Sequence, residues 1–343
     1  MDIKDLLRFC IQQKGSDLHL STGLPPVLRV DGDIRRINAP ALTKDNMDAI
    51  IKQILSEKAL AQFTTKKECD FSYNAADVSR FRVNAFYHNR GIGIVFRAIP
   101  KIQSMETLGL GQIFKDIAIK PRGLCLVTGP TGSGKSTTLA AMIEFINCHR
   151  HQHILTIEDP IEFIYESKKC LINQREVHQH TDTFSNALKS ALREDPDVIL
   201  VGEMRDLETI RLALSAAETG HLVFATLHTS SAPQTIDRII DVFPAAEKHM
   251  IRSMLSESLE AVVTQTLLKK TAGGRIAAHE IMLGTSAIRN LIRESKTAQI
   301  YSTMQTSHNI GMQTLDQHLS SLLEQELITR ETAKEKAAQP EKF

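Results

Sequence analysis

The residues best suited to chemistry in this 343-residue sequence lie in one glycine-rich segment. Residues 129–136 read Gly-Pro-Thr-Gly-Ser-Gly-Lys-Ser, which matches the pattern G-x-x-x-x-G-K-[ST] of a phosphate-binding loop. Glycines let backbone N–H groups turn toward phosphate oxygens, and the N-terminus of a following helix adds a partial positive charge. The sequence therefore predicts a site for the phosphates of a nucleotide, made by the residues Gly129, Pro130, Thr131, Gly132, Ser133, Gly134, Lys135, Ser136 and Thr137.

The residues on either side of this segment favour a phosphate-binding loop over a glycine-rich turn that binds nothing. An apolar run over residues 124–127 leads in, and helix-forming residues 137–147 lead out. In such a loop the ammonium of Lys135 is expected to reach the β- and γ-phosphates, and the hydroxyl of Ser136 to hold Mg²⁺. The motif alone does not separate a motor from a kinase or a GTPase.

A carboxylate that could support the metal follows a second apolar run. Residues 197–203 read Asp-Val-Ile-Leu-Val-Gly-Glu. A P-loop enzyme needs an acid after this strand for the Mg²⁺ shell, and the common form has Asp where this sequence has Gly202. Glu203 is therefore the expected metal-supporting residue, directly or through water. A surface glutamate after a buried strand is the alternative.

Three more carboxylates, Glu158, Asp159 and Glu162, follow the apolar run 154–157. Like charges this close repel one another unless a cation lies among them, which ATP with Mg²⁺ and nearby arginines would supply. One of them could orient or deprotonate the attacking water, with Glu162 as the preferred base and Glu158 as the second choice. A solvated acidic turn is the alternative.

Histidines His221 and His228 bracket the apolar run 222–227. In open α/β sheets ligands bind at the carboxyl ends of the strands, so His228 is placed to sense the γ-phosphate by a hydrogen bond. Taken alone, either residue is more often a histidine that caps a helix or is buried with its hydrogen bonds satisfied. The alternating histidines of residues 149–153 have no carboxylate or cysteine nearby to complete a metal site, so a solvated loop is favoured there.

The elements that must position these residues fall into two parts. Residues 1–98 read as α+β, with helical spacing over 3–13 and 45–62 and a strand-turn-strand pattern over 81–98. Residues 99–121 are the expected linker. From 122 to 343, short apolar runs at 124–128, 154–157, 198–201 and 222–226 alternate with helix-like stretches, which predicts an α/β fold with a mostly parallel sheet.

Composition excludes several classes of protein. Lys+Arg exceed Asp+Glu by 41 − 40 = 1, and aromatic residues make up 5% with no Trp, so a nucleic-acid coat or stacking platform is not favoured. No apolar run reaches the roughly 20 residues that span a bilayer, and the N-terminus lacks an export pattern. The five cysteines are scattered, which indicates reduced thiols and a cytoplasmic location.

Taken together, these motifs resemble the secretion ATPase superfamily, and within it the PilT-type retraction ATPases of bacterial type IV pili. The resemblance rests on four segments: residues 129–136 as Walker A, 156–162 as the aspartate box, 202–203 at the Walker B position and 221–228 as the histidine box. The resemblance extends from residues 16–20, Ser-Asp-Leu-His-Leu, to the C-terminal helix. Glycine in the Walker B strand is normal in this family.

The resemblance implies a homohexameric ring in which a PAS-like N-terminal domain precedes a RecA-like P-loop ATPase domain. It also implies that N-terminal arginines reach the nucleotide. Arg82 and Arg97 match these arginines by order and by a spacing of 97 − 82 = 15 residues. A cation that arrives only on domain closure would couple phosphate charge to domain position. An exposed arginine on a strand is the alternative.

Residues 287–294, Ala-Ile-Arg-Asn-Leu-Ile-Arg-Glu, match an element typical of retraction ATPases. Extension-type relatives are longer at the N-terminus and often carry a zinc-binding set of four cysteines, and this sequence has neither. The expected function is therefore an ATP-hydrolysing motor for pilus retraction and twitching motility. Its expected partners are an inner-membrane pilus platform protein, with peripheral membrane association through it, and a paralogous retraction ATPase.

Three alternatives stay open at this point. One is a pilus extension or type II secretion assembly ATPase of the same superfamily. Another, from a different class, is a RecA-like nucleic-acid translocase, although no direct nucleic-acid contact and no transmembrane segment are expected. The last is an accessory ring that binds nucleotide without hydrolysis, against which intact Lys135, Glu162 and Glu203 argue.

Overall fold

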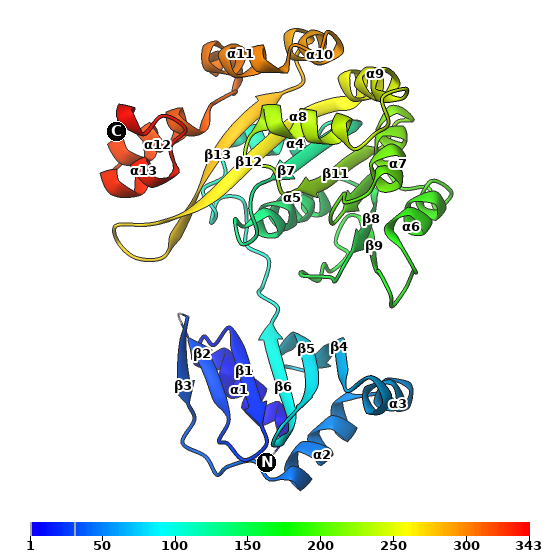
Figure 1. The fold of residues 1–343 in the computed structure, drawn as a ribbon, viewed down its shortest axis with the longest axis vertical. Coiled ribbons are helices and arrows are strands. Elements are labelled where there is room, and N and C mark those ends of the chain that lie inside the picture. Colours follow the sequence, from blue (N-terminus) through cyan, green and yellow to red (C-terminus); the bar gives the residue numbers. More distant parts are fainter. Residues whose placement is uncertain (1, 31) are drawn as a thin grey trace. The chain divides into compact units, whose positions relative to one another are not determined.

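The chain folds into two units that divide between Lys101 and Ile102 in the computed structural model, which describes residues 2–30 and 32–343. The first unit is an antiparallel sheet with helices, and the second is a mostly parallel sheet with helices on both faces (Figure 1). This is the α/β architecture predicted from the alternation of short apolar runs and helical stretches.

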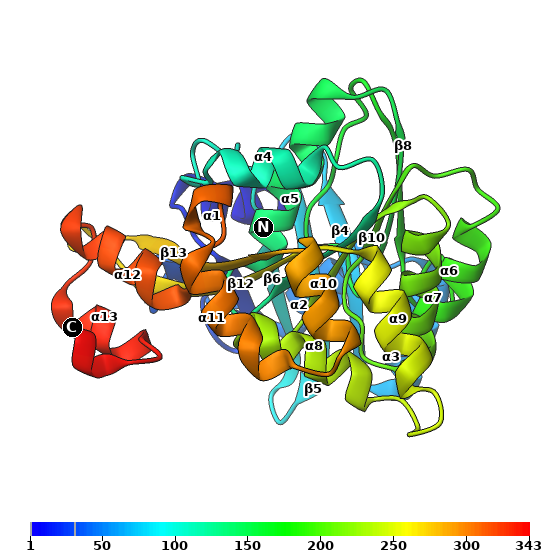
Figure 2. The same ribbon diagram turned by 90° about the horizontal axis from the view of Figure 1, so that it is seen from above.

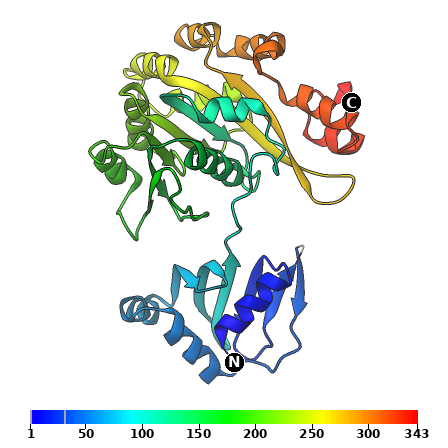
Figure 3. The same ribbon diagram turned by 180° about the vertical axis from the view of Figure 1, so that it is seen from behind.

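The first unit contains a six-stranded sheet in the order β3-β2-β1-β6-β5-β4. Apolar side chains alternate along its strands, so that residues such as Leu18, Phe81 and Phe96 form one buried face together with the helices. Helix α1 lies across that face (Figure 3). The elements are α1 (Ile3–Gln12), β1 (Asp17–Ser21), β2 (Val27–Val30), β3 (Asp33–Arg36), α2 (Lys44–Ile54), α3 (Glu57–Lys66), β4 (Glu68–Ala75), β5 (Ser79–His88) and β6 (Gly91–Ala98).

The helical spacing over residues 45–62 predicted one helix, and the structure has two. Leu55 ends α2 with extended backbone at ψ 140°, and Ser56 begins α3 by accepting a hydrogen bond from the N–H of Ala59 at 3.4 Å. A serine N-cap inside an apolar periodic stretch restarts the helix on a new axis. The prediction of a single helix was wrong because the apolar period continues across the break.

The second unit contains a seven-stranded sheet in the order β13-β12-β7-β11-β10-β8-β9, in which β13 alone runs antiparallel to its neighbour. Its elements up to β11 are α4 (Gln112–Ala118), β7 (Gly123–Thr128), α5 (Lys135–His149), β8 (His153–Glu158), β9 (Leu171–Glu176), α6 (Phe184–Ala191), β10 (Val198–Val201), α7 (Leu207–Glu218) and β11 (Leu222–Leu227). The remaining elements are α8 (Ala232–Asp241), α9 (Lys248–Ser258), β12 (Leu259–Lys269), β13 (Arg275–Leu283), α10 (Ser286–Arg293), η1 (Thr297–Gln299), α11 (Ile300–Thr306), η2 (His308–Ile310), α12 (Leu315–Glu324), α13 (Arg330–Lys336) and η3 (Pro340–Lys342).

Both faces of this sheet are covered, which explains why its strands read as continuous apolar runs. In β7, Leu124 and Leu126 pack into a core with α6 to α10, whereas Cys125 and Val127 pack into a second core with α4 and α5. Figure 2 shows α4 and α5 on one side of β12 and α8 to α10 on the other. The four strands predicted at the apolar runs are confirmed as β7, β8, β10 and β11.

Residues 99–121, the expected linker, belong for the most part to the second unit. Helix α4 buries Phe114, Ile117 and Ala118 against α5 and the sheet. A seven-residue helix is too short to give a periodic signal in the sequence, so the linker prediction extends too far. Among the described residues, no helix is long and apolar enough to cross a membrane.

Candidate functional site

Four loops that carry the predicted site residues meet at the carboxyl edge of the second sheet. β7, β11, β10 and β8 are consecutive parallel neighbours, with Leu227 opposite Thr128 and Val201 opposite both Ala225 and Ile157. Strands in such a register end at the same edge, so the residues after them come together. The sheet thus gathers the phosphate loop, Glu158, Glu203 and His228 from positions up to a hundred residues apart.

The phosphate loop runs from Gly129 to the first turn of α5. Gly129 has φ +138°, and a Cβ built there would lie 2.3 Å from the backbone oxygen of Gln265 in β12, so only glycine fits. Gly134 has φ +89° and directly precedes the helix that starts at Lys135. The loop therefore follows its neighbouring strand closely and delivers a helix N-terminus to the edge of the sheet, as predicted.

Lys135 is the central cation of the site. Its side chain is folded back into the loop, where Nζ donates to the carbonyl oxygens of Gly129 at 2.8 Å and Pro130 at 3.1 Å. The residue is only 9% exposed. Burial lowers the pKa of Lys135, and the negative charges of Glu203 and Glu162 act in the opposite direction. A buried ammonium held by two neutral carbonyls is ready to exchange them for phosphate oxygens, which are stronger acceptors.

His228 links this lysine to the acid after β10. Its Nδ1 lies 3.5 Å from Lys135 Nζ, and its Nε2 lies 3.0 Å from Glu203 Oε1. A neutral imidazole with its proton on Nε2 satisfies both contacts, because Nδ1 then accepts from the ammonium while Nε2 donates to the carboxylate. His228 thus lies at the carboxyl edge of the sheet beside the phosphate loop, as the sequence predicted.

Glu203 is a partly buried carboxylate with two partners. Oε2 accepts from Arg205 at 2.7 Å while Oε1 accepts from His228. Burial raises the pKa of Glu203, but the hydrogen bonds from Arg205 and His228 and the charge of Arg205 outweigh it and leave the pKa below its usual value. Glu203 is therefore held in the ionised form that a metal-supporting acid requires.

Close packing explains why glycine replaces the usual aspartate at position 202. A Cβ built on Gly202 would lie 3.2 Å from the backbone oxygen of Ile157 and 3.3 Å from Cα of Glu158, tighter than ordinary contacts. The N–H of Gly202 donates to Ile157 O at 2.8 Å. A side chain here would require its neighbours to shift by a few tenths of an ångström, and the acid is carried by the next residue.

Glu158 is a buried acid inside the site, only 8% exposed. It accepts hydrogen bonds from Thr156 Oγ1 at 2.7 Å, Gln174 Nε2 at 3.3 Å and the backbone N–H of Glu162 at 3.5 Å. Burial raises its pKa to about 7, although these hydrogen bonds act to lower it. The acidic cluster therefore relieves its repulsion partly by keeping Glu158 protonated up to neutral pH.

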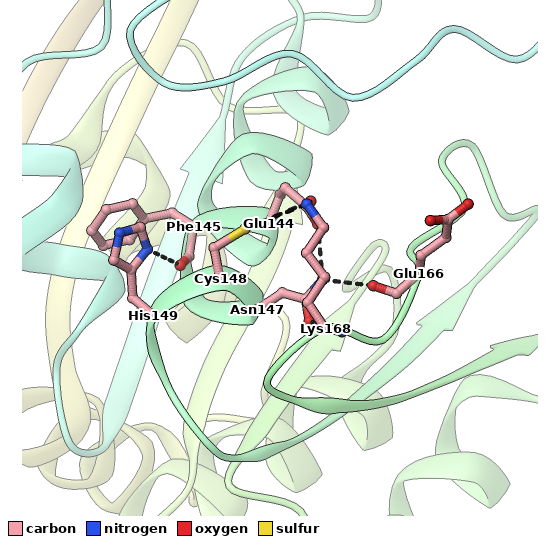
Figure 4. Close-up of polar contacts among 7 residues, drawn as sticks. All are labelled: Glu144, Phe145, Asn147, Cys148, His149, Glu166 and Lys168. Atoms are coloured by element: carbon pink, nitrogen blue, oxygen red, sulfur yellow. Dashed lines mark hydrogen bonds and ion pairs between the residues drawn. The ribbon is translucent and has the colours of Figure 1, made fainter.

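Glu162 lies exposed on the loop between β8 and β9, and this loop is anchored to α5. Asn147 is fully buried and uses its whole amide: Nδ2 donates to Glu166 O at 2.8 Å, and Oδ1 accepts from the N–H of Lys168 at 3.0 Å. The Lys168 ammonium lies between Glu144 Oε1, at 2.5 Å, and Cys148 Sγ, at 3.5 Å (Figure 4). The helix that begins at the phosphate loop thus also fixes the loop that carries Glu162.

The other histidines lie outside this site. His221 is at the opposite end of β11 from His228, where its Nδ1 is 3.0 Å from the backbone oxygen of Ala216 near the end of α7. His149 ends α5 and stacks on Phe145. Within the described residues, no cluster of three or more His, Cys, Asp or Glu side chains could hold a metal ion.

Arg82 and Arg97 belong to the first unit, where they are cross-strand partners in β5 and β6. Arg97 Nε contacts the buried carboxylate of Asp17 at 2.8 Å. Burial raises the pKa of Asp17, but hydrogen bonds from Arg97 and Ser16 outweigh it, so the pKa is lowered. Among the described side chains, no carboxylate pairs with Arg82, which is exposed. The sequence signal for both arginines was the family spacing alone.

Ser136 and Glu203 are the residues that could share a Mg²⁺ ion with a nucleotide. Mg²⁺ is commonly held by one or two carboxylates, several waters and the phosphates of a substrate. One hydroxyl in the first turn of α5 and one ionised carboxylate across the loop suit that mode of binding, and do not suit a site made by the protein alone. The donor set therefore fits a metal that arrives with the nucleotide.

Three residues that contact the site were not identified from the sequence. Arg205 pairs with Glu203, Asn147 anchors the acidic loop, and Gln265 contacts the phosphate loop from β12. The first follows the Walker B strand closely enough to be suspected. The other two are buried polar residues of a helix and a strand, and only the tertiary contacts identify them.

Comparison with protein families gives a match over nearly the whole chain. The family model described as type II/IV secretion system protein matches residues 2–332. The chain is 64% identical to the type IV pilus retraction ATPase PilT of Pseudomonas aeruginosa over 344 aligned positions, which cover all of both chains. It is 58% identical to a twitching motility protein of Neisseria gonorrhoeae, covering 92% of this chain and 85% of that one.

A solved structure supports the same assignment of fold. The crystal structure of a pilus retraction motor, PilT, with bound ADP superposes with a TM-score of 0.94 at 45% identity, covering 100% of this chain and 99% of the other. At this identity and coverage the likeness extends through both units of the chain.

The raised pKa of Glu158 predicts an unusual dependence of stability on pH. An unfolded carboxyl ionises near 4.5 and the folded one near 7, so between these values the folded state binds more protons and the free energy of unfolding falls as pH rises. At pH 8 the full penalty, about 3 kcal/mol for a shift of this size, is present. Glu158→Gln should remove it, so that the variant unfolds at a higher temperature than wild type at pH 8 and at a similar one at pH 4.5.

Thermal unfolding followed by circular dichroism at several pH values measures this difference. Glu162→Gln is the comparison variant: its side chain is exposed and its charge is the smallest cause of the raised pKa of Glu158, so the fall in stability between pH 4.5 and 7 should persist in it, with the folded pKa of Glu158 moved downward. If the Glu158 variant follows wild type at every pH, the carboxyl is ionised in the folded protein and the argument from burial is wrong.

Proposed function

The chain belongs to the family of type II/IV secretion system proteins, and we propose that it is the ATP-hydrolysing motor that retracts type IV pili and so powers twitching motility. The full-length identity to the Pseudomonas retraction ATPase carries this proposal. The intact phosphate loop and the acids around it supply the groups that hydrolysis needs. The likeness to a retraction motor solved with ADP supports the phosphate loop as the nucleotide site.

In this proposal Lys135 binds the β- and γ-phosphates of ATP after releasing the carbonyls of Gly129 and Pro130. The backbone N–H groups of residues 131–137 surround the phosphates, and the N-terminus of α5 adds its partial positive charge. When Lys135 moves to the phosphate, His228 loses or shifts the contact with its Nδ1, and the change reaches Glu203 through Nε2. His228 thereby reports whether a γ-phosphate is present.

Ser136 and Glu203 would hold Mg²⁺ beside the phosphates. Bound there, the ion would neutralise charge that develops on the phosphoryl oxygens during transfer. Glu203 is already kept ionised by Arg205 and His228, and Ser136 lies in the first turn of the helix that follows the loop.

Glu162 is proposed as the base that takes a proton from the attacking water. It is exposed, its loop is held in place by Asn147, and its charge acts on Lys135. The water oxygen then attacks the γ-phosphorus, and the bond to the β-γ bridging oxygen breaks to release ADP and phosphate. Glu158, protonated up to neutral pH, helps by donating from its carboxyl group or by holding the N–H of Glu162.

Ring assembly and the two arginines complete the motor. We place six copies in a ring, with Arg82 and Arg97 neutralising charge on the phosphates when an N-terminal domain closes on the nucleotide. The pairing of Arg97 with Asp17 and the lack of a carboxylate partner for Arg82 among the described residues suit Arg82 best for a mobile contact. Release of phosphate then relaxes the contact, and the ring turns a partner.

The proposed partners are an inner-membrane pilus platform protein and a paralogous retraction ATPase. The proposed location is the cytoplasmic face of the inner membrane at the pilus base, with attachment through the platform protein. ATP with Mg²⁺ is the proposed substrate, and nucleic acid is not a proposed partner.

The cellular test is deletion of the gene, followed by counts of surface pili and a score of surface motility. Many pili without movement would mean that filaments assemble but are not withdrawn, which is the expected result. Cells without pili would make this an assembly ATPase of the same family. The proposal would be contradicted if pili and movement were unchanged and the purified protein hydrolysed no ATP in the absence of DNA.

Replacement of Lys135 by Ala should abolish ATP turnover and fail to restore motility in the deletion strain. The phosphates would lose the one buried cation of the loop. Loss of a group that stabilises the charge on the transferred phosphoryl group lowers the rate by orders of magnitude. A phosphate-release assay on the purified variant measures this. Normal turnover would show that the loop is not the hydrolytic site.

Replacement of Glu162 by Gln should keep nucleotide binding and lower kcat about 100-fold or more, the usual loss for a general base. Glu158→Gln should cost less, because a neutral amide resembles the protonated acid found there up to neutral pH. Turnover and ADP affinity of both variants at pH 6, where Glu158 is protonated, separate the two roles. A larger loss of kcat in the Glu158 variant would make that residue the base.

Replacement of Arg82 by Ala should lower turnover and leave ring assembly intact, because the side chain is exposed and makes no ion pair with any described residue. Light scattering gives the assembly state, and the phosphate-release assay gives turnover. Arg97→Ala should instead also lower thermal stability, since it leaves the buried carboxylate of Asp17 without its close cation. An Arg82 variant that no longer assembles would assign that residue to an interface.

A further inference from the structure

A buried glutamine in the strand beside the phosphate loop holds that loop at two points. Gln265 lies in β12 and is only 2% exposed. Its Nε2 donates to the backbone oxygen of Ser133 at 2.6 Å, and its Oε1 accepts from Thr138 Oγ1 at 2.8 Å. One side-chain amide therefore joins the last turn of the loop to the first turn of α5.

The register of the sheet places this residue. β12 pairs in parallel with β7, with Val263 opposite Val127 and Thr264 opposite Thr128. Gln265 therefore comes level with Gly129, where the loop leaves the sheet. The backbone oxygen of Gln265 is also the atom that a Cβ at Gly129 would meet at 2.3 Å. The start and the end of the loop thus both contact the same residue of the neighbouring strand.

The contact with Ser133 fixes the direction of a phosphate-binding N–H group. In a planar trans peptide the C=O of one residue and the N–H of the next point in opposite directions. Because Gln265 holds the Ser133 oxygen toward β12, the N–H of Gly134 in the same peptide must point away from β12, into the loop. Gly134 immediately precedes Lys135, and its φ of +89° leaves the peptide plane to be fixed by partners, since glycine has no side chain to restrict it.

We propose that Gln265 is a positioning residue for ATP binding and hydrolysis, which sets the Gly134 N–H toward the phosphates by holding the Ser133 carbonyl from behind. The inference rests on the proposed function, because it assumes that the loop binds a nucleotide. An uncharged amide serves both contacts at neutral pH, whereas an ionised carboxylate can only accept. The carbonyl of Ser133 needs a donor, and Oε1 accepts from Thr138 in the same plane.

Three substitutions separate this role from general support of the fold. Gln265→Leu removes both contacts, and Gln265→Glu keeps an acceptor for Thr138 but loses the donor to Ser133. Thr264→Val is the matched control: it removes the buried contact between the hydroxyls of Thr264 and Thr128, 2.8 Å apart, one residue away on the same strand. That contact joins β12 to β7 and does not touch the loop.

Affinity for Mg·ADP, measured by displacement of a fluorescent ADP analogue, is the readout, with thermal unfolding recorded for each variant. Both Gln265 variants should bind ADP about tenfold or more weakly than wild type, the loss expected for one charge-assisted hydrogen bond. Thr264→Val should bind as wild type does, even if it unfolds at a lower temperature. Equal ADP affinity of wild type and the Glu variant would overturn the inference.

A pH series adds a readout that a purely structural role would not change. The carboxyl introduced by Gln265→Glu is buried, so it should take up a proton as pH falls, and its hydroxyl can then donate to Ser133. ADP affinity of this variant relative to wild type should recover at low pH, whereas that of Gln265→Leu should not. Parallel pH profiles for the two variants would contradict the role of the donated hydrogen bond.

The outcome for wild type separates the two proposals. If wild type binds no ADP, the proposed nucleotide site itself is wrong. If wild type binds ADP and the Gln265 variants bind equally well, the nucleotide site stands and the role of Gln265 is wrong.

Discussion

A buried ammonium group at the start of α5 needs partners, and most features of the second unit supply them. Lys135 bonds the carbonyls of Gly129 and Pro130, contacts His228 and lies in the field of Glu203 and Glu162. An isolated buried cation would be costly, and neutral carbonyls are weaker partners than an anion. Lys135 therefore has hydrogen-bond acceptors but no anion bonded to its ammonium group. A phosphate would supply that anion.

Helix α5 carries this arrangement at both of its ends. Its first turn belongs to the phosphate loop and is braced by Gln265 from β12, while its last turns hold the acidic loop through Asn147. Both braces are buried side-chain amides whose nitrogen donates and whose oxygen accepts, and such hydrogen-bonded networks favour one arrangement of the backbone. The distance between the phosphate loop and the loop of Glu162 is thus set by a rigid element.

The sequence allowed the sheet and most of the site to be predicted, because parallel strands buried on both faces read as short apolar runs and their following residues must meet at one edge. Helix boundaries were harder to predict from the sequence. The serine cap at Ser56 splits a periodic stretch, and α4 is too short to show a period. The protonation of Glu158 could not be predicted, since it depends on burial among residues distant in sequence. Gln265 was missed because nothing in the sequence shows that β12 lies beside the phosphate loop.

The most direct test of this account is a structure of the chain with Mg·ADP bound. The account predicts that Lys135 Nζ leaves the carbonyls of Gly129 and Pro130 and lies within hydrogen-bond distance of the β-phosphate, with the Gly134 N–H directed at the same group and Gln265 still bonded to Ser133. A phosphate bound elsewhere, with Lys135 still on the two carbonyls, would contradict it.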